Sequence, residues 1–262
     1  MNEGLRAIGL GEAQVMATLL VLARVGPLFA LGPVFGSRLL NSRARALCAV
    51  GLSFGIAPVV ARDVEVPTGV VELVMVLAGE VLVGLAFAYV VSLLFAAVSA
   101  AGSMLDTLIG FSYGSLVDPV TGTQASVLSN AYAMMAALIF LAIGGDAWVV
   151  EGLARTYTLL PAGDAVSTAA LAEGARTAFS GIFLSAVQIA APVMLALILT
   201  DVALGIVTRA VPQMNAFAVS FPVKIVVGLL VLVASLPYAG GWIGDQVQDS
   251  VRDAMRTVAA AG

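Results

Sequence analysis

Histidine is absent from the 262-residue chain, and cysteine occurs only at Cys48. Because imidazole and thiolate groups supply most zinc, haem and iron–sulfur ligands, their scarcity excludes most metal sites, and a lone cysteine excludes a disulfide framework. Serine or cysteine nucleophiles would lack their usual histidine base, and the sequence has neither a G-x-x-x-x-G-K-[ST] phosphate loop nor a G-x-S-x-G elbow. We therefore expect no enzyme activity, no metal and no other cofactor.

Charged residues are also scarce, at 11% of the chain, and the formal net charge of −4 gives no support to nucleic-acid binding. Hydrophobic residues make up 61% of the chain, whereas soluble domains are roughly 45–50% apolar and about 25% charged. The composition is therefore that of a membrane protein, whose apolar surface needs lipid or protein partners. The N-terminus lacks the basic region of a secretory signal, so the first apolar segment is expected to belong to the mature protein.

Six apolar segments predict an all-α, polytopic integral membrane protein with long, kinked helices. The segments span residues 15–35, 46–60, 70–101, 127–143, 179–200 and 219–236. A membrane span needs roughly 20 residues, whereas the third segment would form a helix of about 48 Å, longer than the hydrocarbon core of about 30 Å. It must therefore tilt, bend or project from the bilayer, and Gly79 and Gly84 are the expected bending points.

The arginines of the short loops predict the orientation of these segments. The first loop has Arg38, Arg43 and Arg45, whereas the second has only Arg62, offset by two acidic residues. Because positive charge favours the cytoplasmic side, we expect the first, third and fifth loops in the cytoplasm and both termini outside.

Ionisable residues inside apolar segments are costly, and they are usually paired or functional. Seven occur here: Arg24, Glu72, Glu80, Asp106, Asp201, Arg209 and Lys224. Glu80 needs a partner or a wet cavity, and an Arg24–Glu80 pair would meet that need. Asp201, Arg209 and Lys224 gather around the fifth loop, where they form either a hairpin tip in water or ion pairs between subunits.

A stripe of small residues recurs at four-residue steps in the third segment: Gly84, Ala88, Ser92, Ala96 and Ala100. Such a stripe lets another helix approach closely. We therefore expect tight helix packing along it.

The tail beyond Trp242 has an apolar face and an acidic face at helical spacing. The apolar face consists of Ile243, Val247, Val251 and Met255, and the acidic face of Asp245, Asp249 and Asp253. This pattern predicts a short amphipathic helix, which is either a solvated helix end or a contact for a partner.

The stretch from Gly102 to Ala125 has no clear helical period, and Gly110, Gly114 and the Asp118-Pro119 step favour an irregular loop. Its apolar residues argue against disorder: Leu105, Leu108, Ile109, Phe111, Tyr113, Leu116 and Val117. Irregular backbone at membrane depth is tolerated only inside protein or along a cavity. The loop is therefore either an apolar seal that excludes ions from a conduit by dewetting or a plain buried connector.

Three stretches resemble the FliR family of flagellar biosynthetic proteins, which are subunits of type III protein export gates. They are GFSYGSLVDPVTGTQ at residues 110–124, LARTYTLLPAG at residues 153–163, and residues 204–232 with the elements RAVPQMNAF and FPVK. The resemblance covers essentially the whole chain.

The resemblance implies a hetero-oligomeric gate with FliP and FliQ subunits, and with FlhB and FlhA, in the bacterial inner membrane at the flagellar basal body. Residues 1–178 would form a FliP-like helical part that includes the loop at 102–125. Residues 179–240 would form a FliQ-like hairpin, followed by the amphipathic tail at 241–262. The gate would contact membrane lipid and pass unfolded protein substrates.

The resemblance also implies which residues close and join the gate. Its pore plug corresponds to Leu108, Ile109, Gly110, Phe111, Tyr113, Gly114, Leu116, Asp118 and Pro119. In an extended loop, Ile109, Phe111 and Tyr113 would share one side. The hairpin tip would contact other subunits through Asp201, Arg209, Gln213 and Lys224.

The function implied by this resemblance is a channel subunit that lines and plugs the pore for unfolded flagellar substrates. One rival is the equivalent subunit of a virulence-type secretion system, which differs in substrates but not in mechanism. A second rival is a stand-alone secondary transporter. That fold would need a midplane site between inverted repeats, and the sequence shows no internal repeat.

Overall fold

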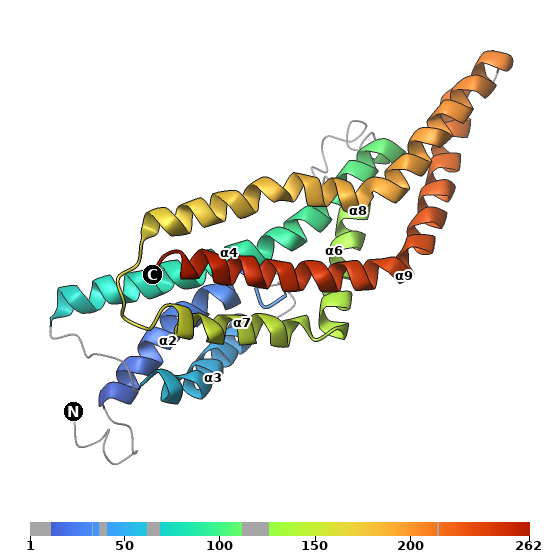
Figure 1. The fold of residues 1–262 in the computed structure, drawn as a ribbon. Coiled ribbons are helices and arrows are strands. Elements are labelled where there is room, and N and C mark those ends of the chain that lie inside the picture. Colours follow the sequence, from blue (N-terminus) through green and yellow to red (C-terminus); the bar gives the residue numbers. More distant parts are fainter. Residues whose placement is uncertain (1–11, 33, 37–40, 62–68, 112–125, 214) are drawn as a thin grey trace, which may run out of the picture. The chain divides into compact units, whose positions relative to one another are not determined.

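The computed structural model describes residues 12–32, 34–36, 41–61, 69–111, 126–213 and 215–262, and these contain helices and no strand. The helices are α2 (Glu12–Leu31), α3 (Ser42–Val60), α4 (Val70–Ile109), α6 (Val127–Ala142), α7 (Gly145–Leu159), α8 (Thr168–Ala210) and α9 (Ala216–Ala259) (Figure 1). The predicted all-α class is confirmed.

Within the described residues, five helices are long and apolar enough to cross a membrane: α2, α3, α4, α8 and the residues 218–235 of α9. Helices α6 and α7 make a sixth candidate span if they are taken together, although they bend by 72° at the break between them. Gly144 at this break has a φ of 72°, a left-handed value that glycine adopts without steric strain. Each of the six predicted segments therefore overlaps one of these spans, although the first, at residues 15–35, extends beyond the end of α2 at Leu31. Helix α7 is not among the expected helices.

Helix α4 has 40 residues and is longer than its apolar run. The prediction of an irregular stretch from Gly102 is wrong for residues 102–109, which continue the helix to Ile109. Two hydroxyl side chains there bond to the backbone of the helix itself, since Ser103 Oγ and Thr107 Oγ1 donate to the carbonyls of Ser99 and Ser103. Residues 112–125 of the expected loop lie outside the described residues.

The chain divides into two compact units, and α4, α8 and α9 contribute residues to both. Unit 1 comprises Met1–Leu93, Gly144–Ser180 and Val247–Gly262. In this unit α2 crosses α4 at Gly84, where an added Cβ would lie 2.8 Å from the carbonyl carbon of Arg24. Gly84 is therefore a point of close helix approach, and α4 runs unbroken through the positions predicted as bends. Of the small-residue stripe, Ala88 is also buried, whereas Ala96 is exposed.

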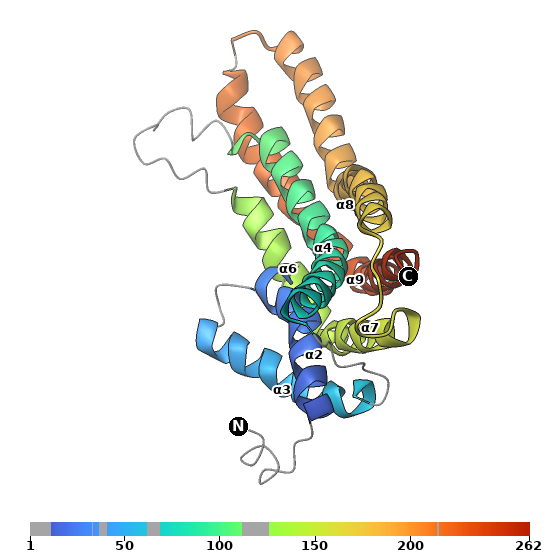
Figure 2. The same cartoon turned by 90° about the vertical axis from the view of Figure 1, so that its left-hand side faces the viewer.

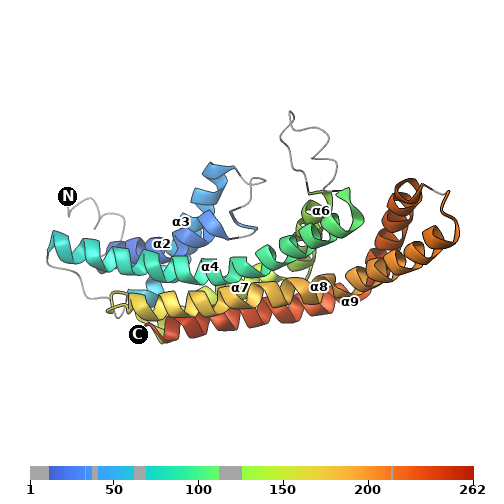
Figure 3. The ribbon, with the colours of Figure 1, turned by 90° about the horizontal axis from the view of Figure 1, so that it is seen from above.

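The end of α9 packs inside unit 1. It runs beside the start of α8 (Figure 3), where a Cβ added at Gly174 would lie 2.5 Å from the Thr257 methyl group. Val247 and Val251 are buried, and Val251 packs against Gly152 of α7. The predicted amphipathic face is confirmed, but the tail continues α9 from Ala216 and is not a separate short helix. Its apolar face serves packing within the chain.

Unit 2 comprises Leu94–Ile143 and Gly181–Gln246. In it the last turns of α4 lie beside α6 (Figure 2), and a Cβ added at Gly102 would lie 2.7 Å from the backbone nitrogen of Ser129. The rings of Phe95 and Phe140 pack edge to face at 5.4 Å across the same contact. Close backbone approach and an aromatic pair thus join α4 to α6, the two helices that flank the expected loop.

Helices α8 and α9 form a hairpin whose tip lies in unit 2 (Figure 1). The tip exposes a set of large apolar side chains: Val202, Ile206, Val207, Val211, Val226, Leu229, Leu230 and Val233. Large apolar side chains that gather on the exposed face of a protein mark a surface for contact with protein or membrane. Lipid or other protein must therefore cover this part of the hairpin.

Candidate functional site

Asp106, in the last turn of α4, binds the N-terminal end of α6. Its carboxylate is 3% exposed and accepts a hydrogen bond of 3.0 Å from the backbone N–H of Leu128 and another from the hydroxyl of Ser126. These donors belong to the first turn of α6, so Asp106 caps that helix end from another helix. The last turn of α4, which ends at Ile109, and the start of α6 at Val127 are therefore held together by one carboxylate.

Gly110 ends α4 in a left-handed conformation with a φ of 101°, and its N–H donates to the carbonyl of Asp106 at 3.0 Å. This is the helix-ending geometry that glycine favours. The expected extended alternation is therefore wrong for Ile109 and Phe111, because Ile109 is the last helical residue and Gly110 turns the chain. The other expected plug residues lie outside the described residues: Tyr113, Gly114, Leu116, Asp118 and Pro119.

Ile109 and Phe111 pack on the beginning of α9. Ile109 is 3% exposed, and its Cδ1 would lie 2.9 Å from a Cβ added at Gly228. The rings of Phe111 and Phe221 meet edge to face at 5.9 Å. Such aromatic pairs contribute about 0.5–1.5 kcal/mol beyond their burial. Leu108, Ile109 and Phe111 form the root of the loop. This root contacts α9 through apolar side chains.

Lys224 adds a polar contact to the same place. Its Nζ lies 2.6 Å from Asp201 Oδ1 on α8 and donates to the backbone carbonyl of Leu108 at 3.2 Å. A cation near the last carbonyls of a helix satisfies acceptors that have no helical partner. Of the residues expected at the hairpin tip, Asp201 and Lys224 therefore form an ion pair within the chain, whereas Arg209 and Gln213 are exposed to solvent in the described structure.

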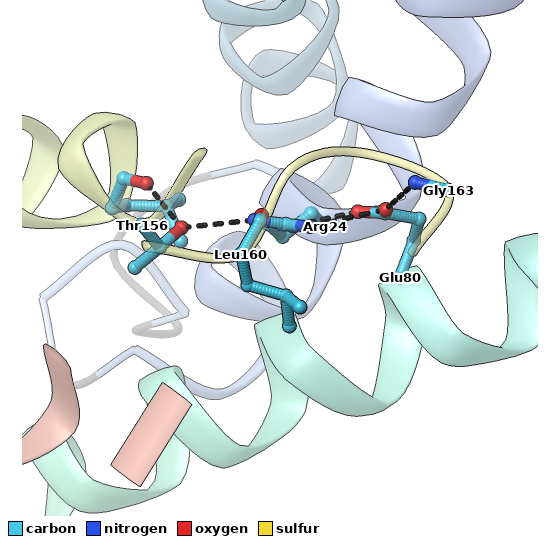
Figure 4. A network of polar contacts seen from close by, with 6 residues as sticks. Arg24, Glu80, Thr156, Leu160 and Gly163 are labelled. Carbon is cyan, nitrogen blue, oxygen red and sulfur yellow. Dashed lines mark hydrogen bonds and ion pairs between the residues drawn. The ribbon is translucent and has the colours of Figure 1, made fainter. Parts of the chain in front are cut away.

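A second polar site lies inside unit 1, where Arg24 of α2 and Glu80 of α4 form a bidentate ion pair (Figure 4). The Nε–Oε2 distance is 2.6 Å and the Nη2–Oε1 distance is 3.1 Å. Both side chains are almost fully buried. The suggested Arg24–Glu80 pair is therefore confirmed.

Helix α7 and the residues after it complete this network (Figure 4). Arg24 Nη1 donates to the carbonyl of Leu160 at 2.9 Å and to the hydroxyl of Thr156 at 3.3 Å, while the N–H of Gly163 donates to Glu80 at 3.0 Å. The guanidinium also lies 4.1 Å from the centre of the Tyr157 ring. Residues 153–163, one of the stretches that carry the family resemblance, thus supply hydrogen-bond partners to this buried pair.

Comparison with known proteins gives the chain its family. The family of bacterial export proteins, family 1, matches residues 15–250. The chain belongs to this family. Among the relatives of the chain, the flagellar biosynthetic protein FliR of Bacillus subtilis strain 168 is 32% identical over 226 residues, covering 84% of this chain and 86% of the relative.

Two further relatives are similar over the same share of the chain. FliR of Aquifex aeolicus strain VF5 is 32% identical over 218 residues, covering 83% of this chain and 84% of the relative. The surface presentation of antigens protein SpaR of Salmonella typhimurium strain LT2 is 30% identical over 220 residues, covering 84% of this chain and 82% of the relative. The expected resemblance to FliR is confirmed.

Proposed function

We propose that this chain is a non-enzymatic channel subunit of the flagellar type III protein export gate in the bacterial inner membrane. The single observation that carries the proposal is the family match over residues 15–250, with flagellar FliR proteins among the relatives at 32% identity. The helices long enough to cross a membrane agree with it. The substrates of such a gate are unfolded flagellar proteins in transit across the membrane.

Residues 108–119 act as the plug of the pore in this proposal. The described part supports it, because the root of the segment is apolar and is anchored at Asp106, Ile109 and Phe111. An apolar segment in a narrow passage blocks ions because it offers them no hydration. A fixed root keeps such a segment at one position in the passage.

Partner subunits cover the exposed apolar hairpin in this proposal, with FliP and FliQ as direct neighbours and FlhB and FlhA as further members of the gate. Residues 1–178 are the FliP-like part, 179–240 the FliQ-like hairpin and 241–262 the tail. Arg209 and Gln213, both exposed at the hairpin tip, supply polar contacts to these neighbours. Asp201 and Lys224 contact these neighbours as an ion pair.

Removing the aromatic side chains of the plug is expected to make the assembled gate leak. Replacement of Phe111 and Tyr113 by alanine takes away apolar bulk that excludes water, so membrane conductance should rise in cells that carry the variant. The measurement is ion flux across the inner membrane, with gate assembly quantified in parallel.

The control for this leak replaces Phe54, an exposed phenylalanine of α3 outside the hairpin, with alanine. It removes an aromatic ring away from the plug and should leave conductance at the wild-type value. Unchanged conductance in a correctly assembled Phe111→Ala/Tyr113→Ala gate would contradict the plug role.

The chain is expected to purify as part of a large complex, because its exposed apolar surface needs protein cover. Native mass measurement after affinity capture of a tagged chain should find it with several partner subunits, and expression without partners should lower its abundance. Recovery as a stable monomer in detergent would argue against the proposal.

The SpaR relative favours a second candidate, the equivalent subunit of a virulence-type secretion system. The two candidates share fold and mechanism and differ in substrate. Complementation separates them: loss of the gene should abolish motility in the flagellar case and leave it intact in the other.

A further inference from the structure

We propose that Lys224 is a latch that holds the root of the plug on helix α9 and links it to the α8–α9 hairpin. This inference rests on the plug role proposed above and adds a positioning residue to it. Lys224 is the only lysine in the chain, and its side chain is 17% exposed in the described structure.

The position of the ammonium group carries the argument. It joins three helices, because it sits on α9, pairs with Asp201 on α8 and donates to the last turn of α4 at Leu108. The Leu108 carbonyl lies at the C-terminal end of α4, where carbonyls lack a helical donor and the helix dipole is negative. A cation there has a favourable field and an acceptor to bind.

Two apolar contacts flank Lys224 on α9. Phe221 lies one turn before Lys224 on α9 and packs on Phe111, while Gly228 lies one turn after it and packs on Ile109. All three α9 positions therefore face the root of the plug at the spacing of one helical turn. Gly228 is required for this approach, since any side chain there would meet Ile109.

The ion pair with Asp201 gives the latch its link to the hairpin. If the tips of α8 and α9 separate, Asp201 moves away from Lys224 and the ammonium group loses the charge that fixes its position. The hydrogen bond to Leu108 then weakens, and the root of the plug is freed. Movement of the hairpin and release of the plug are coupled in this arrangement.

Replacement of Lys224 by methionine tests the latch, because methionine keeps the unbranched apolar stem and removes the charged group. Loss of a charge-assisted hydrogen bond shifts a two-state equilibrium by roughly tenfold or more. We expect a roughly tenfold rise in resting ion flux through the assembled gate, and a smaller rise for Asp201→Asn, which weakens the bond to Leu108 but keeps its donor.

A disulfide distinguishes the latch from a subunit contact made by the same lysine. Cys48→Ser yields a cysteine-free chain, into which Ile109→Cys and Gly228→Cys are introduced together. The Cβ position at residue 228 lies 3.6 Å from the Cγ1 of Ile109, which is a position that the Sγ of a cysteine at residue 109 can take, so a small adjustment brings the two cysteines to bonding distance. When oxidised, this bridge should close the leak of Lys224→Met, and a reductant should restore the leak.

Each outcome decides the question. Ile109→Cys alone is the matched control, and its flux should not respond to oxidation. A tight Lys224→Met gate would overturn the latch while the plug role still stands on the Phe111→Ala/Tyr113→Ala result. A leak that the oxidised bridge fails to suppress would show that Lys224 acts through other contacts, and this also overturns the latch.

Discussion

Replacement of Arg24 by methionine is expected to destabilise the protein by about 3–5 kcal/mol, since it leaves a buried carboxylate without its partner. Glu80 is 3% exposed and receives both of its arginine hydrogen bonds from this one side chain. The loss should appear as low abundance in the membrane and as a lower unfolding temperature of the gate in detergent.

The double variant Arg24→Met/Glu80→Leu is expected to recover part of the loss. It replaces the ion pair with two apolar side chains of similar size, a change that is often neutral in buried sites. Recovery should stay incomplete, because the carbonyl of Leu160 and the N–H of Gly163 lose the partners they have in the native network. Each buried group without a partner costs about 1–3 kcal/mol.

Arg155→Met provides the matched control for Arg24→Met. Arg155 pairs with Glu151 at 2.6 Å, the same distance as in the buried pair, but both side chains are more than half exposed. Exposed pairs contribute only about 0.2–1 kcal/mol. An Arg24→Met variant no less stable than Arg155→Met would contradict the structural role of the network.

The cost of burying a charge made the Arg24–Glu80 pair predictable from the sequence. Two ionisable residues deep in separate apolar segments each require a partner, and the choice of partners is small in a chain with so few charges. The rest of the network was not predictable in this way. Thr156 is an ordinary helix residue, and the Leu160 carbonyl and Gly163 N–H are backbone groups that carry no signal in the sequence.

Helix α7 was missed for a related reason. Asp146, Glu151 and Arg155 interrupt its hydrophobicity, so it does not stand out as an apolar segment, although Val149 and Leu153 are fully buried. Its amphipathic pattern was present in the sequence and could have indicated a helix.

Asp106 shows the limit of local reasoning at the candidate site. Its position in an apolar segment predicted that it needs a partner, and Ser126 just before an apolar run is typical of a helix start. The capping contact itself joins residues that are 20 or more apart in sequence. Sequence spacing does not predict such a contact, so the bond between Asp106 and the start of α6 is visible only in the structure.

Replacement of Gly84 by alanine is the second change with a large expected effect. The added methyl group would collide with the backbone carbonyl of Arg24, which cannot rotate away as a side chain could. Overpacking of this kind costs about 1–3 kcal/mol and occasionally more. Membrane abundance and the unfolding temperature should fall, whereas Gly51→Ala on α3, where nothing lies within 4 Å of the added Cβ, should be neutral or stabilising by up to about 1 kcal/mol.

The effects of Gly84→Ala and Arg24→Met are expected to be less than additive. Glu80 and Gly84 are one turn apart on the same face of α4, so α2 places the backbone of Arg24 on Gly84 and its side chain on Glu80. A methyl group that pushes α2 away would also stretch the ion pair, and that part of the cost vanishes once Arg24 is methionine. A double-mutant cycle measures this coupling, which ranges from about 0.5 to 3 kcal/mol for residues in contact. Additive losses would mean that the helix crossing and the ion pair are independent, and they would contradict this geometry.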